Sequence, residues 1–168
     1  MELLDAIMTR ASAGRLAEPG PTAEDLARIV DAANRAPDHG RLKPWRLIVL
    51  QGASREKFTE AVVEARRNRA PAPNDEQLRV EREKISRSPL LLVIACVPQR
   101  GHPKVPEVEQ LVAAGAAAEN AFLAAHAQGY GVMWKTGPAA YEPGVKAALG
   151  LAPEDHIVAI MHFGTRSK

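Results

Sequence analysis

The chain has 168 residues, of which 46% are hydrophobic, and its 22 lysines and arginines against 20 aspartates and glutamates leave a net charge of +2. This length predicts one domain over residues 1–168, large enough to bury roughly two thirds of its unfolded surface. The charges form no run, so the composition gives no indication of nucleic-acid binding. A lone cysteine excludes an intramolecular disulfide, and neither a secretory signal pattern nor an apolar run of roughly 18 residues is present. We therefore expect a cytoplasmic protein that binds neither nucleic acid nor membrane.

A small cationic cluster follows the first expected helix, which the apolar spacing places over residues 2–10. The cluster contains Arg10, Ser12 and Arg15, in a stretch that ends the helix near Gly14. Two guanidinium groups beside a hydroxyl and loop amides can hold a phosphate through charge-assisted hydrogen bonds. The same residues also fit a solvated helix end, where arginines complement the helix dipole. Residue types alone leave both interpretations open.

A shaped loop lies between the second helix and the first buried strand. Thr22 and Asp25 form an N-cap pattern for that helix, which must end before Pro37. The loop that follows carries Asp38 and His39, and a short apolar strand over residues 47–50 comes after it. Loops held at both ends often contact ligands, so the two side chains are candidate ligand contacts. They could equally hydrogen-bond the turn itself.

The middle of the chain predicts a charged excursion at about residues 66–88. A third helix over residues 54–67 is followed by a proline-containing stretch, residues 68–74, that cannot stay helical. Residues 75–87 are densely charged with few apolar positions, which is typical of a solvated surface and also compatible with a lid or partner-binding segment. Residues 90–97 then form an apolar run that predicts a strand buried on both faces. Cys96, inside that run, is interpreted as core filling.

The longest expected element is an alanine-rich helix between Pro106 and Gly129. Its apolar positions wrap around most of the circumference, so we expect it to be buried on nearly all sides. Alanines and Gly115 permit close approach of another helix, which a second copy of the chain can supply. This helix is therefore predicted to serve a dimer interface. An extended segment over residues 130–137, a short helix over 143–149 and a last strand over 157–163 complete the chain.

Four apolar strands separated by helices require a sheet covered on both faces, which predicts a three-layer α-β-α sandwich. The glycine-rich phosphate-binding fingerprints G-x-G-x-x-G and G-x-x-x-x-G-K-[ST] are both missing, which weakens an ordinary Rossmann or P-loop interpretation. The five histidines show no pair spaced i, i+4 and lie near no cysteine pair. The spacing therefore predicts no metal site.

Several short motifs, taken together and in order, resemble the nitroreductase family. They are Arg10-Ala11-Ser12, the segment from Arg35 to His39 followed by Pro44-Trp45, the long helix from Glu109, and the stretch from Gly129 to Gly137 that contains Trp134-Lys135-Thr136. The resemblance covers nearly the whole chain and is similar in spacing to a short bacterial branch of NAD(P)H nitroreductases. It implies an α+β fold with a mixed, largely antiparallel central sheet between two helical layers.

The resemblance also implies a function, namely an FMN-dependent homodimer with flavins at the subunit interface. A nicotinamide nucleotide, NADH or NADPH, would reduce the flavin, and an acceptor such as a nitroaromatic or quinone would reoxidise it. By position, one subunit would hold the phosphate and ribityl side with Arg10, Ala11 and Ser12. Trp134, Lys135 and Thr136 would lie near the ring, with Lys135 beside its N1/O2 edge, while Arg35 and His39 would reach in from the other subunit. No residue is assigned as a catalytic base.

This chain departs from the family pattern at three places. His39, Arg41 and Lys43 stand where many relatives have serine, asparagine and glutamine before the Pro-Trp pair, and Ala11 replaces the second arginine of a frequent Arg-Arg-Ser start. Relatives commonly continue past the last strand into an arm around the partner subunit, whereas this sequence ends at Lys168. Two alternatives stay open: a flavin-binding or storage module without turnover, and a dimeric interaction protein without flavin.

Overall fold

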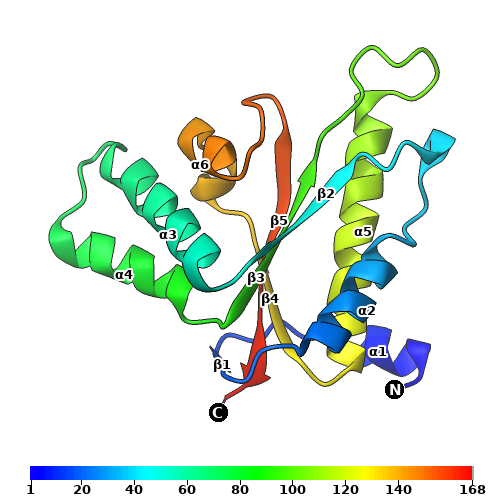
Figure 1. Cartoon of the computed structure of the whole chain (residues 1–168), viewed down its shortest axis with the longest axis horizontal. Helices are drawn as coiled ribbons and strands as arrows, with labels where there is room; N and C mark the ends of the chain where they lie inside the picture. The colour runs from blue at the N-terminus through cyan, green and yellow to red at the C-terminus, as the bar shows by residue number, and fades with distance from the viewer. Residues whose placement is uncertain (168) are drawn as a thin grey trace.

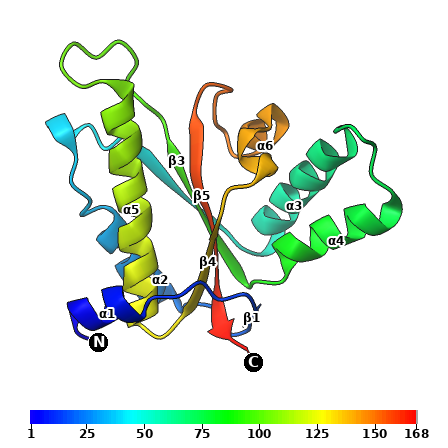
Figure 2. The same ribbon diagram turned by 180° about the vertical axis from the view of Figure 1, so that it is seen from behind.

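In the computed structural model, which describes residues 1–167, helices cover both faces of a five-stranded sheet (Figure 1). One helical layer holds α1, α2 and α5 and the other holds α3, α4 and α6, as the view from behind also shows (Figure 2). The three-layer α+β arrangement is thus confirmed. Lys168 lies outside the described residues. The helices are α1 (Leu3–Thr9), α2 (Ala23–Ala33), α3 (Gly52–Arg67), α4 (Asp75–Ser86), α5 (Glu107–Ala127) and α6 (Pro143–Ala148), with short 3-10 turns η1 (His39–Arg41) and η2 (Pro138–Tyr141).

The sheet is organised around its last strand in sequence. The strands are β1 (Leu16–Ala17), β2 (Trp45–Leu50), β3 (Leu90–Cys96), β4 (Gly131–Lys135) and β5 (His156–Arg166). β5 pairs with β1, β3 and β4, and β2 pairs with β3. All of these pairs are antiparallel, so the predicted largely antiparallel sheet is confirmed, and no parallel pair occurs within residues 1–167. β1 was not predicted, because two residues are too short to show a strand period.

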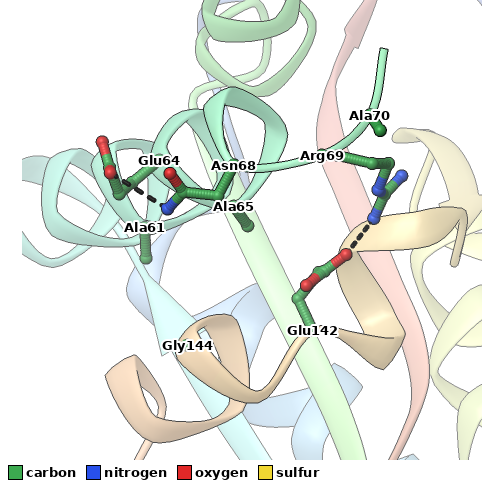
Figure 3. A pocket seen from close by; sticks show the side chains of 8 residues that line it. All are labelled: Ala61, Glu64, Ala65, Asn68, Arg69, Ala70, Glu142 and Gly144. Atoms are coloured by element: carbon green, nitrogen blue, oxygen red, sulfur yellow. Dashed lines mark hydrogen bonds and ion pairs between the residues drawn. The ribbon is translucent and has the colours of Figure 1, made fainter. Parts of the chain in front are cut away.

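The charged excursion forms a loop and helix α4. Together with α3, α4 makes a helical hairpin on one face of the sheet. α4 is capped by Asn74, which accepts a hydrogen bond from the Gln77 backbone N–H, and it buries Leu78 and Ile85. The loop between α3 and α4 is held by an ion pair between Arg69 and Glu142, which precedes α6 (Figure 3). A cavity of about 500 Å³ lies beside this pair. None of the ligand-contact residues expected from the sequence lines that cavity.

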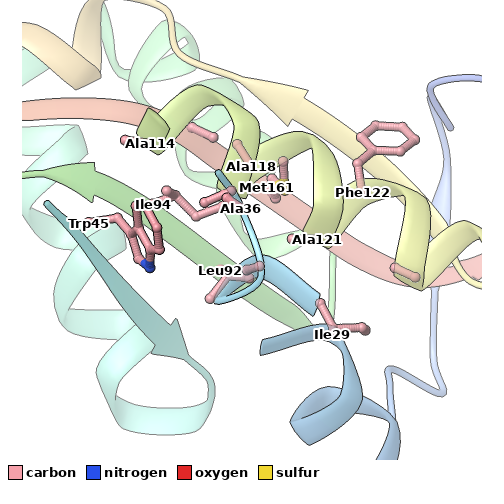
Figure 4. Close-up of a cluster of buried hydrophobic side chains, with 14 of the residues drawn as sticks. Ile29, Ala36, Trp45, Leu92, Ile94, Ala114, Ala118, Ala121, Phe122 and Met161 are labelled. Atoms are coloured by element: carbon pink, nitrogen blue, oxygen red, sulfur yellow. The ribbon is translucent and has the colours of Figure 1, made fainter. Parts of the chain in front are cut away.

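Two hydrophobic cores lie on the two faces of the sheet. The core under α2 and α5 contains Trp45, Leu92 and Phe122 (Figure 4), and the opposite core contains Phe58 and Leu91. β3 supplies alternate side chains to both cores, because successive residues of a strand point to opposite faces. Its seven residues are all buried, as predicted. Burial also raises the pKa of the Cys96 thiol to about 11, which supports its interpretation as core filling.

α5 differs from the prediction in its burial. Its bounds agree to within two residues of those predicted, but only the side that faces α2 and the sheet is buried. Val108 and Val112, on the opposite side, are 65% and 67% exposed, and Leu111 is exposed as well. α1 likewise exposes most of its apolar residues, including Leu3. The expectation of burial on nearly all sides is therefore not met within one chain, because no other element of residues 1–167 covers this apolar face of α1 and α5.

Candidate functional site

The loop after α1 lies between the C-terminal end of α5 and the free edge of β4. Arg10 ends α1, and its guanidinium carbon stands 4.8 Å from the centre of the Phe122 ring of α5. The backbone N–H of Ala13 donates to the carbonyl of Val132 at 2.8 Å, which fixes the loop alongside β4. Ala11 and Ser12 are exposed, whereas Arg10 is half-buried. The loop thus presents a cation, a hydroxyl and backbone groups to solvent in one place.

Arg166, at the end of β5, adds a second guanidinium to this loop. Its Nη2 donates to the carbonyl of Ala11 at 3.1 Å and lies 3.3 Å from Nδ1 of His126. Gly131 permits this approach, since a Cβ there would come within 2.8 Å of the Arg166 Cγ atom. Arg166 therefore lies beside Ala11, the position at which many members of the family that the sequence resembles have a second arginine. Sequence reasoning missed it, because only the pairing of β5 with β1 brings it to the loop.

His126 contacts Arg166, and its own hydrogen bonds define its protonation state. The Thr9 hydroxyl donates to the carbonyl of Asp5 at 2.5 Å, so at 3.0 Å from His126 Nε2 it acts as the acceptor of that ring N–H. The other ring nitrogen, Nδ1, is then free to accept from Arg166. Burial, with the charges of Arg166 and Arg10, lowers the pKa of His126. The histidine is therefore neutral and links α1, α5 and β5.

The Trp134-Lys135-Thr136 stretch sends its side chains to both faces of the sheet. The Trp134 indole packs against the α5 core and donates to the carbonyl of Val158 at 3.2 Å. Lys135 points to the opposite face and lines a pocket beside α4 together with Thr136. Burial, then the charges of Arg87 and Lys84, lower the pKa of Lys135. The backbone of this stretch continues the edge that the Arg10–Ser12 loop borders at Val132.

Arg35 and His39 do not join the Arg10–Ser12 loop within one chain. His39 Nδ1 donates to Glu109 Oε2 at 2.5 Å, near the start of α5. Arg10 contacts Phe122, and about 20 Å of helix separates the two contact points on α5. Arg35 instead lines a groove of about 430 Å³ on the apolar face of α1 and α5. Within one chain the structure therefore brings neither residue into contact with the Arg10–Ser12 loop.

The loop around His39 has the shape that its sequence suggested. The Asp38 carboxylate accepts a hydrogen bond from the Lys43 backbone N–H at 2.6 Å, so Asp38 bonds the turn. His39 does not, because its ring bonds α5. Arg41 and Lys43 adopt φ values of 57° and 46°, a left-handed conformation that is rare for residues other than glycine. Their side chains are both exposed on this loop.

A buried histidine lies on the same face of the sheet as Lys135. His162 is 2% exposed, and its Nδ1 is 2.8 Å from the Ser88 hydroxyl. Burial first, then the charges of Lys135 and Arg87, lower the pKa of His162 to about 3. The ring is therefore neutral at physiological pH.

Acid should destabilise the protein through this histidine. Its pKa is about 3 when folded and about 6.5 when unfolded. The stability it contributes is complete above pH 6.5 and is lost as the pH falls towards 3, because the unfolded chain binds the proton first. Between pH 7 and pH 5 we expect a loss of about 2 kcal/mol in the free energy of unfolding from this residue. Urea denaturation at the two pH values measures this loss. In a His162→Gln variant this part of the pH dependence should disappear, whereas His156→Gln, at an exposed position, should show the same pH dependence as the wild type.

Together these observations define an α+β sandwich with a two-arginine loop beside a sheet edge and an uncovered apolar helix face. Residues 7–165 match the model of the Nitroreductase family, and the chain belongs to that family. It is 38% identical over 165 residues to the Escherichia coli protein named "Putative NAD(P)H nitroreductase YdjA", covering 98% of this chain and 88% of that one.

Solved structures agree in fold. A nitroreductase-like family protein from Bacillus cereus superposes with a TM-score of 0.84 at 23% identity, covering 100% of this chain and 87% of that one. A nitroreductase from Desulfovibrio desulfuricans, solved in complex with FMN, gives a TM-score of 0.77 at 20% identity, covering 100% and 88%. Within residues 1–167 no cluster of three or more histidine, cysteine or acidic side chains could hold a metal ion, and no helix is long and apolar enough to cross a membrane.

Proposed function

We propose that this protein is an FMN-dependent oxidoreductase that carries reducing equivalents from NAD(P)H to an acceptor such as a nitroaromatic or a quinone. The observation that carries the proposal is the loop after α1, where Arg166 bonds the carbonyl of Ala11, the residue next to Arg10. Family membership supports it, as do the NAD(P)H in the name of the Escherichia coli relative and the FMN in the Desulfovibrio structure.

The loop fits the phosphate of a flavin mononucleotide. The phosphate is a dianion near neutral pH. The charges of Arg10 and Arg166 both act on His126, so the two cations lie in the same part of the molecule. Guanidinium groups bind phosphate oxygens through paired, charge-assisted hydrogen bonds, and the exposed Ser12 hydroxyl offers one more donor. The backbone carbonyl of Ala11 orients Arg166 instead of contacting the ligand. This chemistry favours a bound phosphate over a solvated helix end.

Two copies of the chain complete the site in this proposal. The apolar face of α1 and α5 is uncovered within one chain, and Arg35 lines a groove on that face. Joining two such faces would bury Val108 and Val112, which supplies a hydrophobic driving force for a homodimer. Arg35 and His39 of one subunit would then reach the flavin held by the Arg10 loop of the other.

The protein's part in the reaction is to bind, orient and stabilise charge. FMN, when bound, supplies the hydride chemistry by accepting hydride from the nicotinamide and giving it to the acceptor. Arg10 and Arg166 would hold the phosphate, and neutral His126 keeps Arg166 in place. The Lys135 ammonium would stabilise negative charge that develops on the reduced ring. No side chain is assigned as a catalytic base, because solvent would supply the proton.

The visible spectrum of the purified protein tests the proposal directly. We expect flavin absorbance near 450 nm that bleaches on anaerobic addition of NADH or NADPH and returns when a nitroaromatic or quinone is added. A flavin-storage module would keep its colour without oxidising NAD(P)H. A non-flavin interaction protein would be colourless and would not take up added FMN, which would contradict the proposal.

Replacing Lys135 by glutamine should make the bound flavin harder to reduce. Removing one cation from a half-buried position is expected to cost about 1–2 kcal/mol of stabilisation of the reduced ring. For a two-electron couple this corresponds to a fall of roughly 20–40 mV in the reduction potential. Potentiometric titration measures the shift, and Lys104→Gln, in an exposed loop, is the matched control. An unchanged potential in Lys135→Gln would remove this role from Lys135.

A further inference from the structure

A pocket of about 260 Å³ opens between α4 and the end of β4, on the sheet face opposite α5. The β4–β5 register pairs Lys135 with Ile160, which places Lys135 and His162 on one face as diagonal neighbours. Ile85 and Ile160 supply apolar surface. The polar side chains that line the pocket are Glu81, Lys84, Lys135, Thr136 and His162.

The buried ring of His162 leaves one nitrogen unpaired. Ser88 is fully buried, and within residues 1–167 its hydroxyl bonds only the Nδ1 atom of His162. If the hydroxyl accepted a proton from Nδ1, its own hydrogen would be buried without a partner, which is costly. The hydroxyl therefore donates to Nδ1, and the neutral ring carries its hydrogen on Nε2. Nε2 is buried and has no hydrogen-bond partner among residues 1–167. Because His162 lines the pocket, this N–H is the donor that it has left for a ligand.

The charges around the pocket are not balanced. Lys84, Arg87 and Lys135 all lower the pKa of Lys135 or His162, while Glu81 is the one acidic side chain that acts in the opposite sense on Lys135. Glu81 is paired with Lys84 at 3.1 Å. Cations therefore outnumber anions, and the ammonium of Lys135 is half-buried with like charges for neighbours. Such an excess of positive charge beside a free N–H donor favours an anionic ligand.

We propose that this pocket binds the carboxylate of a small organic molecule, with the ammonium of Lys84 and the Nε2–H of His162 as its principal donors. A carboxylate accepts hydrogen bonds on two oxygens and suits one ammonium and one neutral N–H. The apolar surface of Ile85 and Ile160 accommodates the hydrocarbon part of the molecule. That the carboxylate belongs to the electron acceptor rests on the proposed function, because Lys135 and Thr136 border both the expected flavin position and this pocket.

The first test measures binding and needs no turnover. Benzoate is titrated calorimetrically into the protein as purified and after loading with FMN. We expect binding that weakens at least tenfold in Lys84→Gln, and also in His162→Phe if that variant folds. Lys57→Gln, which removes an exposed lysine of α3 outside the pocket, should bind as the wild type does. No binding, or equal binding by wild type and Lys84→Gln, would overturn the proposal whether or not the protein is a reductase.

The second test identifies the source of the carboxylate. The values of kcat/KM are compared for 4-nitrobenzoate and for 4-nitrobenzamide, which has nearly the same shape without the charge. If the acceptor carries the carboxylate, the wild type prefers 4-nitrobenzoate, and Lys84→Gln lowers that preference about tenfold, mainly through KM. Benzoate binding without such a preference would support the pocket as a site for a free carboxylate.

Discussion

Replacing Arg10 by alanine is expected to weaken FMN binding by roughly 10- to 100-fold, the range for losing charge-assisted hydrogen bonds to a phosphate. The side chain is half-buried against Phe122, so it is held in position before the ligand arrives. Fluorescence titration of the flavin-free protein with FMN measures the change. Riboflavin, which has no phosphate, should bind wild type and variant almost equally, and this comparison separates a phosphate contact from a general loss of structure.

Arg166→Ala should weaken FMN binding to a similar extent. The double variant Arg10→Ala/Arg166→Ala should lose less binding free energy than the sum of the two single variants. The two cations would share one phosphate, and groups that act on one ligand are not independent. Arg28→Ala is the matched control, because Arg28 pairs with Glu24 on the exposed side of α2. Unchanged FMN affinity in Arg10→Ala would leave the loop as a solvated helix end.

A single charge on the outer face of α5 is expected to split the dimer. Val112 is 67% exposed in one chain, and in the proposed dimer a glutamate there would be buried without a partner at a cost of several kcal/mol. Val112→Glu should therefore raise the dimer dissociation constant at least 100-fold. Sedimentation velocity measures this, and bound flavin should fall in parallel because in the proposed dimer Arg35 and His39 reach the flavin from the partner subunit.

Val80→Glu provides the comparison for that experiment. Val80 is also an exposed apolar residue, but it lies on α4 in the opposite helical layer. The variant should remain dimeric and retain its flavin. If Val112→Glu were equally dimeric, the apolar face of α1 and α5 would not be the interface.

Local sequence signals were enough to predict most helices. Pro106 and Gly129 bracket α5, and the Thr22 hydroxyl accepts from the Asp25 backbone N–H as the N-cap pattern requires. These features depend on neighbours in the chain, so they can be recognised without knowledge of the fold. The burial of α5 could not be judged in the same way. An apolar circumference does not say which side is covered by the same chain and which by another.

The candidate site depends on contacts between distant segments, and there the sequence alone was insufficient. Arg166 reaches Ala11 from 155 positions away, through the pairing of β5 with β1. Nothing in its local pattern distinguishes it from other terminal cations. The resemblance supplied Arg10, Ala11 and Ser12, and the structure fixes the end of their loop, at Ala13, to Val132 on β4, the strand that also carries Trp134 and Lys135. It leaves Arg35 and His39 apart from them, on the groove of α1 and α5 and at Glu109 respectively.

The place of β5 in the sheet has a consequence for biosynthesis. β5 pairs with β1, β3 and β4, all of which precede it in the sequence, and it also carries Arg166. A nascent chain that has not yet released this strand from the ribosome lacks the centre of its sheet, and long-range strand pairing of this kind is slow to form. The sheet can therefore form only after β5 has been released, and until then the early strands depend on protection from aggregation.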